Sequence, residues 1–196
     1  AHILEQKRTG RLVRPSARYV GPPSRPVSDV EGAAEVLDKD PATLTSGERA
    51  ILECPTPTVA LVEGFAIGGG AQVALACDLR LCTPDARFGI TPAKLGIVYA
   101  LQSTARLVDV VGPAWASWIL MTGDLVDATT ALRIGLVHEV SGDVEARAEA
   151  LTGSLRSRAR VSLLGAKALV ARAAAGERTE DAEVLRHYHD SLHGPE

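Results

Sequence analysis

The chain has 196 residues, of which 46% are hydrophobic and 4% aromatic, and its formal net charge at pH 7 is −3. This composition predicts one globular domain with an Ala/Val/Leu-rich core, and the charge excludes a protein devoted to nucleic acid, because phosphate neutralisation needs a basic excess. No apolar run approaches the roughly 20 residues of a membrane span, nothing at the N-terminus resembles a signal peptide, and the three cysteines form no Cys-x-x-Cys pair. We therefore expect a soluble, cytoplasmic protein with no membrane partner.

Residues 1–26 differ in composition from the rest of the chain. They carry six basic side chains against one acid, Glu5, and end in GPPSRP. The pattern predicts an irregular arm, and two interpretations stay open: a solvated segment, or a basic arm that contacts the phosphates of a ligand or partner. Further along, SGERAILEC at 46–54 indicates a short helix.

From residue 58 onward, apolar segments alternate with glycines and short turns. TVALV at 58–62 has the β-branched composition of a buried strand, and three glycines lead from it into an apolar helix over roughly 70–77. LRLCT and ARFGI, at 79–83 and 86–90, indicate two more strands. The remaining predicted elements are helices over 103–112 and 113–123, a helix capped by Asp127, a strand at 136–140, and helix from Asp143 almost to the end with a break near Gly176.

The three glycines Gly68, Gly69 and Gly70 stand where the predicted strand meets the predicted helix. The first amides of a helix have no partner inside it, and the helix dipole adds positive potential there, so these glycines form a candidate anion or oxyanion site. No Gly-Lys-Ser/Thr ending and no Gly-x-Gly-x-x-Gly spacing is present, which excludes the common phosphate and dinucleotide loops. The alternative is that the glycines only permit close packing of helix against strand.

Residues 57–140 resemble the crotonase family, also called the enoyl-CoA hydratase/isomerase superfamily. The glycine-rich turn and the segments ACDLR, ARFG, KLGI, TGD and GLV carry the resemblance. It implies a crotonase-like (ClpP/crotonase) α/β spiral of repeated β-β-α units over 1–140, irregular or incomplete at its start, and a C-terminal helical region over 141–196 that forms a homotrimer or hexamer. It also implies an acyl-CoA thioester as the substrate, no cofactor and no metal, with the Gly69 amide as one of two donors to the thioester oxygen.

Two positions depart from the hydratase pattern of that family. Gln72 and Pro92 stand where hydratases carry glutamates, and neither an amide nor a proline ring can transfer the protons that hydration requires. We therefore do not expect ordinary hydration. Between Gly64 and Ala100 the acids are Asp78, for which a structural role is expected, and Asp85; Glu63 precedes the turn and is expected to be a solvated strand-end acid.

The segment FGITPAKLGIVYA is most similar to the methylmalonyl-CoA decarboxylase branch. Thr91 and Tyr99 match that branch's active-site threonine and tyrosine, which implies decarboxylation of a malonyl-type thioester. The alternatives are a turn residue for Thr91 and a core residue with a satisfied hydroxyl for Tyr99. The implied catalytic residues are Gly69, Thr91 and Tyr99, and the implied substrate-binding residues are Gly68, Gly70, Gln72, Pro92 and Glu31.

Glu31 enters as the nearest candidate for the second oxyanion amide, which the family takes from an upstream loop. The surrounding sequence, DVEGAAE at 29–35, matches that loop at only two or three residues. Two further functions therefore stay open: another crotonase reaction, such as isomerisation or hydrolysis, and a non-catalytic acyl-CoA-binding subunit. Near the C-terminus, His189 and His193 have the i, i+4 spacing of a zinc pair, but with His187 we expect them to be surface histidines on a terminal helix.

Overall fold

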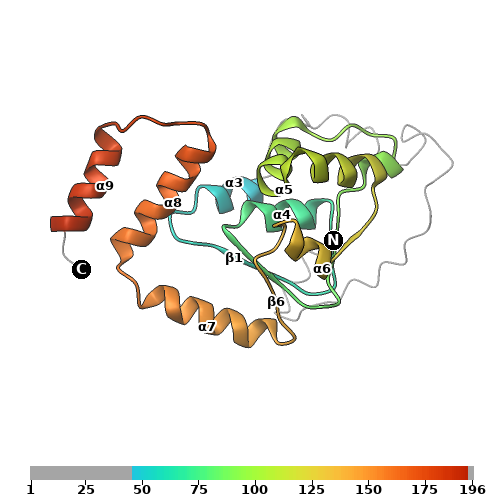
Figure 1. Ribbon diagram of the computed structural model, residues 1–196, viewed down its shortest axis with the longest axis horizontal. Coiled ribbons are helices and arrows are strands. Elements are labelled where there is room, and N and C mark those ends of the chain that lie inside the picture. Colours follow the sequence, from blue (N-terminus) through green and yellow to red (C-terminus); the bar gives the residue numbers. More distant parts are fainter. Residues whose placement is uncertain (1–45, 194–196) are drawn as a thin grey trace.

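The computed structural model describes residues 46–193 and contains two small sheets flanked by helices (Figure 1). The described part begins with α3 (Ser46–Leu52) and continues through β1 (Val59–Val62), β2 (Phe65–Ile67) and α4 (Gly69–Ala76). α4 is the central helix, because it contacts β1, β2, α3 and α5. It begins one residue earlier than the sequence indicated.

The strands form two three-stranded sheets, and the first four described strands of the chain alternate between the two sheets as in a spiral. β1 pairs in parallel with β3 (Leu79–Cys82), which pairs in parallel with β6 (Glu139–Val140). β2 pairs in parallel with β4 (Arg87–Gly89), and β4 pairs antiparallel with β5 (Val126–Asp127). The unit β1-β2-α4 is thus stacked on the next unit, β3-β4-α5, and this confirms the crotonase-like α/β fold.

A kinked helix follows the second unit and covers the core. η2 (Pro92–Lys94) leads into α5 (Leu101–Thr122), which contains the two predicted helices joined at Gly112, where φ is 74° and ψ is 163°. Only glycine takes this positive φ without strain, and Pro113 then starts the second half. α6 (Ala128–Arg133) begins as predicted, with the Asp127 carboxylate accepting from the Thr130 amide at 2.7 Å.

The core lies between α4, α5 and the two sheets. Its members are short apolar side chains, in keeping with the low aromatic content, and the largest fully buried ones are Leu81, Leu107, Ile119, Val137, Val144 and Cys82. The three cysteines are all free thiols. Within residues 46–193, no helix has the length and apolar character needed to cross a membrane.

The C-terminal region is helical, as predicted, and lies to one side of the sheets (Figure 1). It comprises α7 (Val144–Arg156), α8 (Arg160–Ala174) and α9 (Ala182–His193). The helical structure is also interrupted at residues 157–159. The sequence did not indicate this turn, because no glycine or proline marks it. Lys167 of α8 ties this region to the core: its ammonium donates to Asp78 Oδ2 at 2.7 Å and to the Thr56 carbonyl at 3.0 Å.

Candidate functional site

The glycine turn is anchored at its first residue. Gly68 has φ 54° and ψ −115°, a conformation that a residue with a side chain adopts only with strain. Its amide donates to the Gly89 carbonyl of β4 at 2.8 Å, and its carbonyl accepts from the Gln72 amide at 3.0 Å. The turn is therefore fixed both to the neighbouring strand and to the first turn of α4.

The next amide, that of Gly69, differs from its neighbour. Across residues 46–193 it has no hydrogen-bond acceptor, and Gly69 and Gly70 are both exposed. A Cβ added at either would meet nothing within 4 Å, whereas a Cβ at Gly89 would lie 2.5 Å from a Leu125 methyl. Close packing therefore explains Gly89 but not Gly69 or Gly70. Open space beside a donor at a helix N-terminus is the geometry of an anion site.

Gln72 lies one helical turn after Gly69 and on the same face of α4. Its amide nitrogen donates to Ser103 Oγ on α5 at 2.8 Å, and Ser103 is buried. The side chain that stands in the position of a hydratase glutamate is thus held by the neighbouring helix. The sequence analysis did not predict a role for Ser103. The feature that could have indicated one is its position as a small polar residue on the buried face of α5.

Tyr99 packs against the core, and its hydroxyl is buried close to Gln72 and Ser103. Burial, with the nearby Glu48 carboxylate adding to it, raises the pKa of Tyr99 to about 12, against the hydrogen-bonding influence of Gln72 and Ser103. The hydroxyl is therefore protonated at neutral pH. Among residues 46–193, this hydroxyl has no partner within hydrogen-bond geometry.

Thr91 and Pro92 form the start of η2. Thr91 is its half-buried N-cap residue, and its hydroxyl makes no capping bond and no hydrogen bond to any other described residue. Pro92 is buried and accepts the amides of Leu95 and Ile97 through its carbonyl, which shapes the turn. The Thr91 hydroxyl is thus available to a ligand, whereas Pro92 serves the backbone.

The acids noted in the sequence fall into two classes. Asp78 is structural: its Oδ2 accepts from the Thr58 amide at 2.7 Å, the Thr58 hydroxyl at 2.8 Å and Lys167 at 2.7 Å. Glu63 is exposed and lines a groove that also includes Gly70. Glu31 and the basic segment 1–26 lie outside the described residues.

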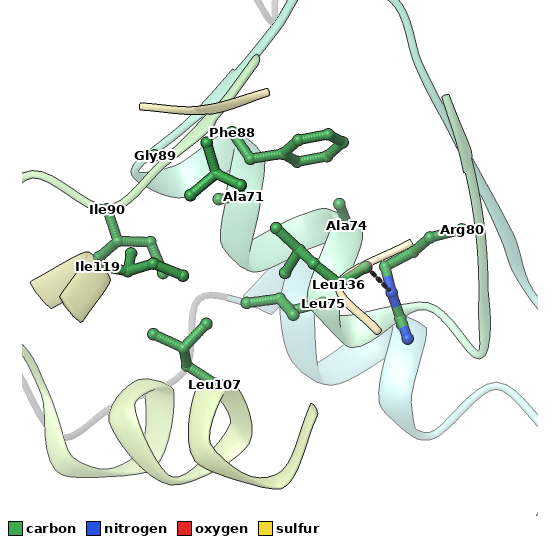
Figure 2. A pocket seen from close by; sticks show the side chains of 11 residues that line it. Ala71, Ala74, Leu75, Arg80, Phe88, Gly89, Ile90, Leu107, Ile119 and Leu136 are labelled. Atoms are coloured by element: carbon green, nitrogen blue, oxygen red, sulfur yellow. Dashed lines mark hydrogen bonds between the residues drawn. The ribbon is translucent and has the colours of Figure 1, made fainter. Parts of the chain in front are cut away.

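Two hollows lie on either side of α4, and they differ in kind. The groove beside β1 and α4, lined also by the first residues of α7, has a volume of about 380 Å³. The enclosed hollow in Figure 2 has a volume of only about 10 Å³ and is surrounded by apolar side chains such as Leu75 and Leu107. The buried Arg80 at its edge is fixed by the Leu136 carbonyl at 2.8 Å. This second hollow is a gap in the core, too small for an acyl chain.

The terminal histidines do not assemble a metal centre. The rings of His189 and His193 stack with centroids 4.7 Å apart on the exposed helix α9, and His187 packs beside Gly165 of α8. Among residues 46–193, no group of three or more His, Cys, Asp or Glu side chains is arranged to hold a metal ion.

Comparison with known proteins agrees with this geometry. A family model described as enoyl-CoA hydratase/isomerase matches residues 36–191. A mitochondrial Δ(3,5)-Δ(2,4)-dienoyl-CoA isomerase from Dictyostelium discoideum is 43% identical over 93 residues, which cover 47% of this chain and 32% of that protein. A crotonyl-CoA hydratase from Syntrophomonas wolfei is 42% identical over 92 residues, which cover 47% of this chain and 35% of that protein. Each match thus spans about a third of the relative's length.

A solved structure gives the likeness over a longer stretch. The crystal structure of an enoyl-CoA hydratase/isomerase family protein from Hyphomonas neptunium superposes with a TM-score of 0.74 and 29% sequence identity, covering 85% of this chain and 63% of that chain. The family model, the relatives and this structure indicate the same family as the glycine turn and the stacked β-β-α units do. The chain belongs to the enoyl-CoA hydratase/isomerase family, the crotonase superfamily.

Proposed function

We propose that this chain acts on an acyl-CoA thioester and decarboxylates a malonyl-type acyl group, such as methylmalonyl-CoA. The observation that carries the proposal is the Gly69 amide, which is exposed, bordered by open space and placed at the N-terminus of α4. Such a donor stabilises negative charge that develops on a thioester oxygen, and this is the main requirement for forming an enolate.

The reaction needs little from the protein beyond that charge stabilisation. The bond between the α-carbon and the carboxylate carbon breaks, and its electron pair forms the enolate, with negative charge on the thioester oxygen beside Gly69. The carboxylate leaves as carbon dioxide, and the α-carbon then takes one proton from solvent. No carboxylate base is required, so Gln72 and Pro92 are compatible with this reaction and incompatible with hydration.

The roles given to Thr91 and Tyr99 follow from the carboxylate that must leave. The Thr91 hydroxyl is half-buried and unbonded to other described side chains, which supports a role in holding this carboxylate out of the thioester plane. The protonated Tyr99 hydroxyl, which is buried near Gln72 and Ser103, is a donor of the right kind, and we assign it a second contact with this carboxylate. We also assign Gly68, Gly70, Gln72 and Pro92 to substrate binding, with Glu31 as the candidate for the second oxyanion amide.

A second candidate function is isomerisation or hydration, favoured by the two relatives, which are named as a dienoyl-CoA isomerase and a crotonyl-CoA hydratase. The proton carrier would then have to come from a residue other than Gln72 and Pro92. Glu63 is one candidate, because its carboxylate lines the same groove as Gly70, and Glu145 lines that groove as well. A third function, acyl-CoA binding without catalysis, applies if no second amide opposes that of Gly69.

One pair of assays separates these functions. The purified protein is given methylmalonyl-CoA carrying a labelled carboxylate, and labelled carbon dioxide is collected; in parallel, crotonyl-CoA is monitored for loss of its conjugated double bond. We expect carbon dioxide release and no hydration. Hydration of crotonyl-CoA without carbon dioxide release contradicts the decarboxylase assignment, and acyl-CoA binding with neither reaction supports the non-catalytic function.

A further inference from the structure

Three arginines surround a hollow at the turn between α7 and α8. This hollow has a volume of about 240 Å³ and lies between the turn and the segment that precedes β1. Arg156 ends α7, Arg158 follows two residues later, and Arg160 begins α8. All three side chains are exposed and line the hollow together.

None of the three arginines is neutralised by an acid in the part of the chain that the structure describes. Arg158 has one polar contact, a long bond of 3.5 Å to Ser154 Oγ, and no ion pair involves Arg156 or Arg160. The nearby Asp78 does not compensate them, because it is already paired with Lys167 at 2.7 Å. The rim of the hollow therefore has a local excess of positive charge, while its walls are mostly apolar, in a protein whose formal net charge is −3.

The local electrostatics of α8 are unfavourable without an anion. A cation at the C-terminus of a helix is stabilised by the helix dipole, which accounts for Arg156. Arg160 stands at the opposite, positive end of a helix dipole, in a helix whose N-cap residue, Ala159, offers no side-chain acceptor and whose first turn contains no acid. By contrast, an aspartate caps α7. Positive charge is thus placed where the backbone already carries unbonded N–H groups.

The remaining walls of the hollow are apolar and set the size of its ligand. Leu155, Leu163, Leu164 and Pro57 supply them. The hollow is smaller than the about 300–1,000 Å³ of pockets for drug-sized ligands. Arginine forks match phosphate oxygens in pairs. The combination fits a phosphate group joined to a small apolar body.

This hollow is separate from the glycine turn. Thr56, which lines it, is bonded to Lys167, and Lys167 is bonded to Asp78 just after the C-terminus of α4. Gly69 lies at the N-terminus of the same helix. The two sites are at opposite ends of α4.

From this arrangement we infer that the Arg156–Arg158–Arg160 hollow is a second binding site, which takes a small phosphorylated organic anion. The inference does not depend on the proposed decarboxylation, because it uses neither the glycine turn nor catalysis.

The test measures binding of pyrophosphate and of phenyl phosphate to the full chain by titration calorimetry at low ionic strength, with inorganic phosphate as the reference anion. We expect both to bind, phenyl phosphate more tightly than inorganic phosphate, and each of Arg158→Gln and Arg160→Gln to weaken binding about 10-fold, the loss of one charge-assisted contact. Arg178→Gln is the matched control, since among the described residues this exposed arginine donates to the carbonyls of Ala173 and Glu177 alone. It removes the same charge and leaves binding unchanged.

Three outcomes overturn the inference. The first is that no probe binds, and the second is that Arg158→Gln/Arg160→Gln binds the probes as the unchanged chain does. The third is displacement of pyrophosphate by 3′,5′-ADP, the phosphate-bearing end of coenzyme A, because this assigns the arginines to the tail of the thioester substrate. Binding that persists in a Gly69→Pro variant, together with no displacement by 3′,5′-ADP, supports a separate site whatever reaction the glycine turn performs.

Discussion

A single backbone N–H, that of Gly69, carries the proposed chemistry, and one substitution removes it alone. Gly69 is the first residue of α4, a position that accepts proline, and its missing Cβ faces open space. We expect Gly69→Pro to lower kcat about 100- to 1,000-fold, the usual effect of losing one oxyanion donor, with little change in the free energy of unfolding. Carbon dioxide release and thermal unfolding measure the two effects.

Gly69→Ala is the control for that experiment. It adds a methyl group in the same open space but keeps the N–H, so activity is expected to stay within a few-fold of the unchanged chain. Equal loss of activity in both variants contradicts the oxyanion role, because the loss then follows side-chain bulk and not the donor.

The Tyr99 hydroxyl makes opposite predictions for stability and for activity. Within residues 46–193 the buried Tyr99 hydroxyl has no hydrogen-bond partner, and such a hydroxyl costs about 1–3 kcal/mol, so Tyr99→Phe is expected to leave the free energy of unfolding unchanged or to raise it. If the hydroxyl orients the leaving carboxylate, the same change slows decarboxylation on the order of 100-fold. Chemical denaturation and carbon dioxide release give the two readouts. Unchanged decarboxylation refutes the role of Tyr99, and reduced stability indicates a hydrogen-bond partner for its hydroxyl.

The position of helix α8 depends on the Lys167–Asp78 pair. Burial by itself raises the pKa of Asp78, but hydrogen bonds from Lys167 and Thr58 outweigh burial and leave the pKa below its usual value. The pair therefore stabilises the folded state above the unfolded pKa of about 3.9, and this stabilisation is lost as the pH falls through the lower folded value.

We expect Lys167→Met to lower the free energy of unfolding by about 1 kcal/mol at neutral pH, the scale of a partly exposed ion pair. The difference from the unchanged chain should be constant above about pH 5, shrink below about pH 4, where Asp78 takes up a proton in the unfolded chain, and be lost as the pH falls through the lower folded pKa. Urea denaturation at several pH values measures this. Arg147→Met, which breaks the Arg147–Glu139 pair, is the control with more exposed partners. A difference that persists at pH values where Asp78 is protonated contradicts the assignment.

Elements with a clear local pattern were predicted well, and short elements fixed by neighbours were not. The apolar run before the glycines and the helix after them were predicted almost to the residue, because their composition and periodicity are unambiguous. β2 was missed: Phe65–Ile67 is too short to show alternation and exists because β4 offers it hydrogen bonds. The predicted strand at 136–140 shortens to β6 for the same reason, since only Glu139 and Val140 find partners on β3.

In the candidate site, too, local features could be predicted from the sequence and contacts between distant residues could not. The sequence predicted an unbonded backbone amide at Gly69, because the first amides of a helix have no acceptor inside that helix. It did not identify Ser103 as the partner of Gln72, because that contact joins residues 31 positions apart, on α4 and α5. Nor did it indicate that the Tyr99 hydroxyl is buried with no hydrogen-bond partner among residues 46–193, which depends on how the loop before α5 packs against the core.

At the scale of the whole molecule, the exposed apolar side chains indicate contact with other subunits. Trp118 and Met121, on one face of α5, are 57% and 77% exposed, and Leu192 on α9 is 78% exposed. Single exposed apolar residues are common, but a helix face with two large ones is typical of an interface. We therefore expect a trimer, held by the faces that α5 and the C-terminal helices leave uncovered.

Sedimentation velocity at micromolar concentration measures the assembly directly. The unchanged chain should sediment at three times its 20.6 kDa mass, and Met121→Asp should dissociate it, because a carboxylate buried in an apolar interface loses its hydration without gaining a partner. Thr179→Asp adds the same charge in the exposed turn between α8 and α9 and should leave the trimer intact. A monomeric unchanged chain contradicts the prediction. A trimer that survives Met121→Asp places the interface on a surface other than this face of α5.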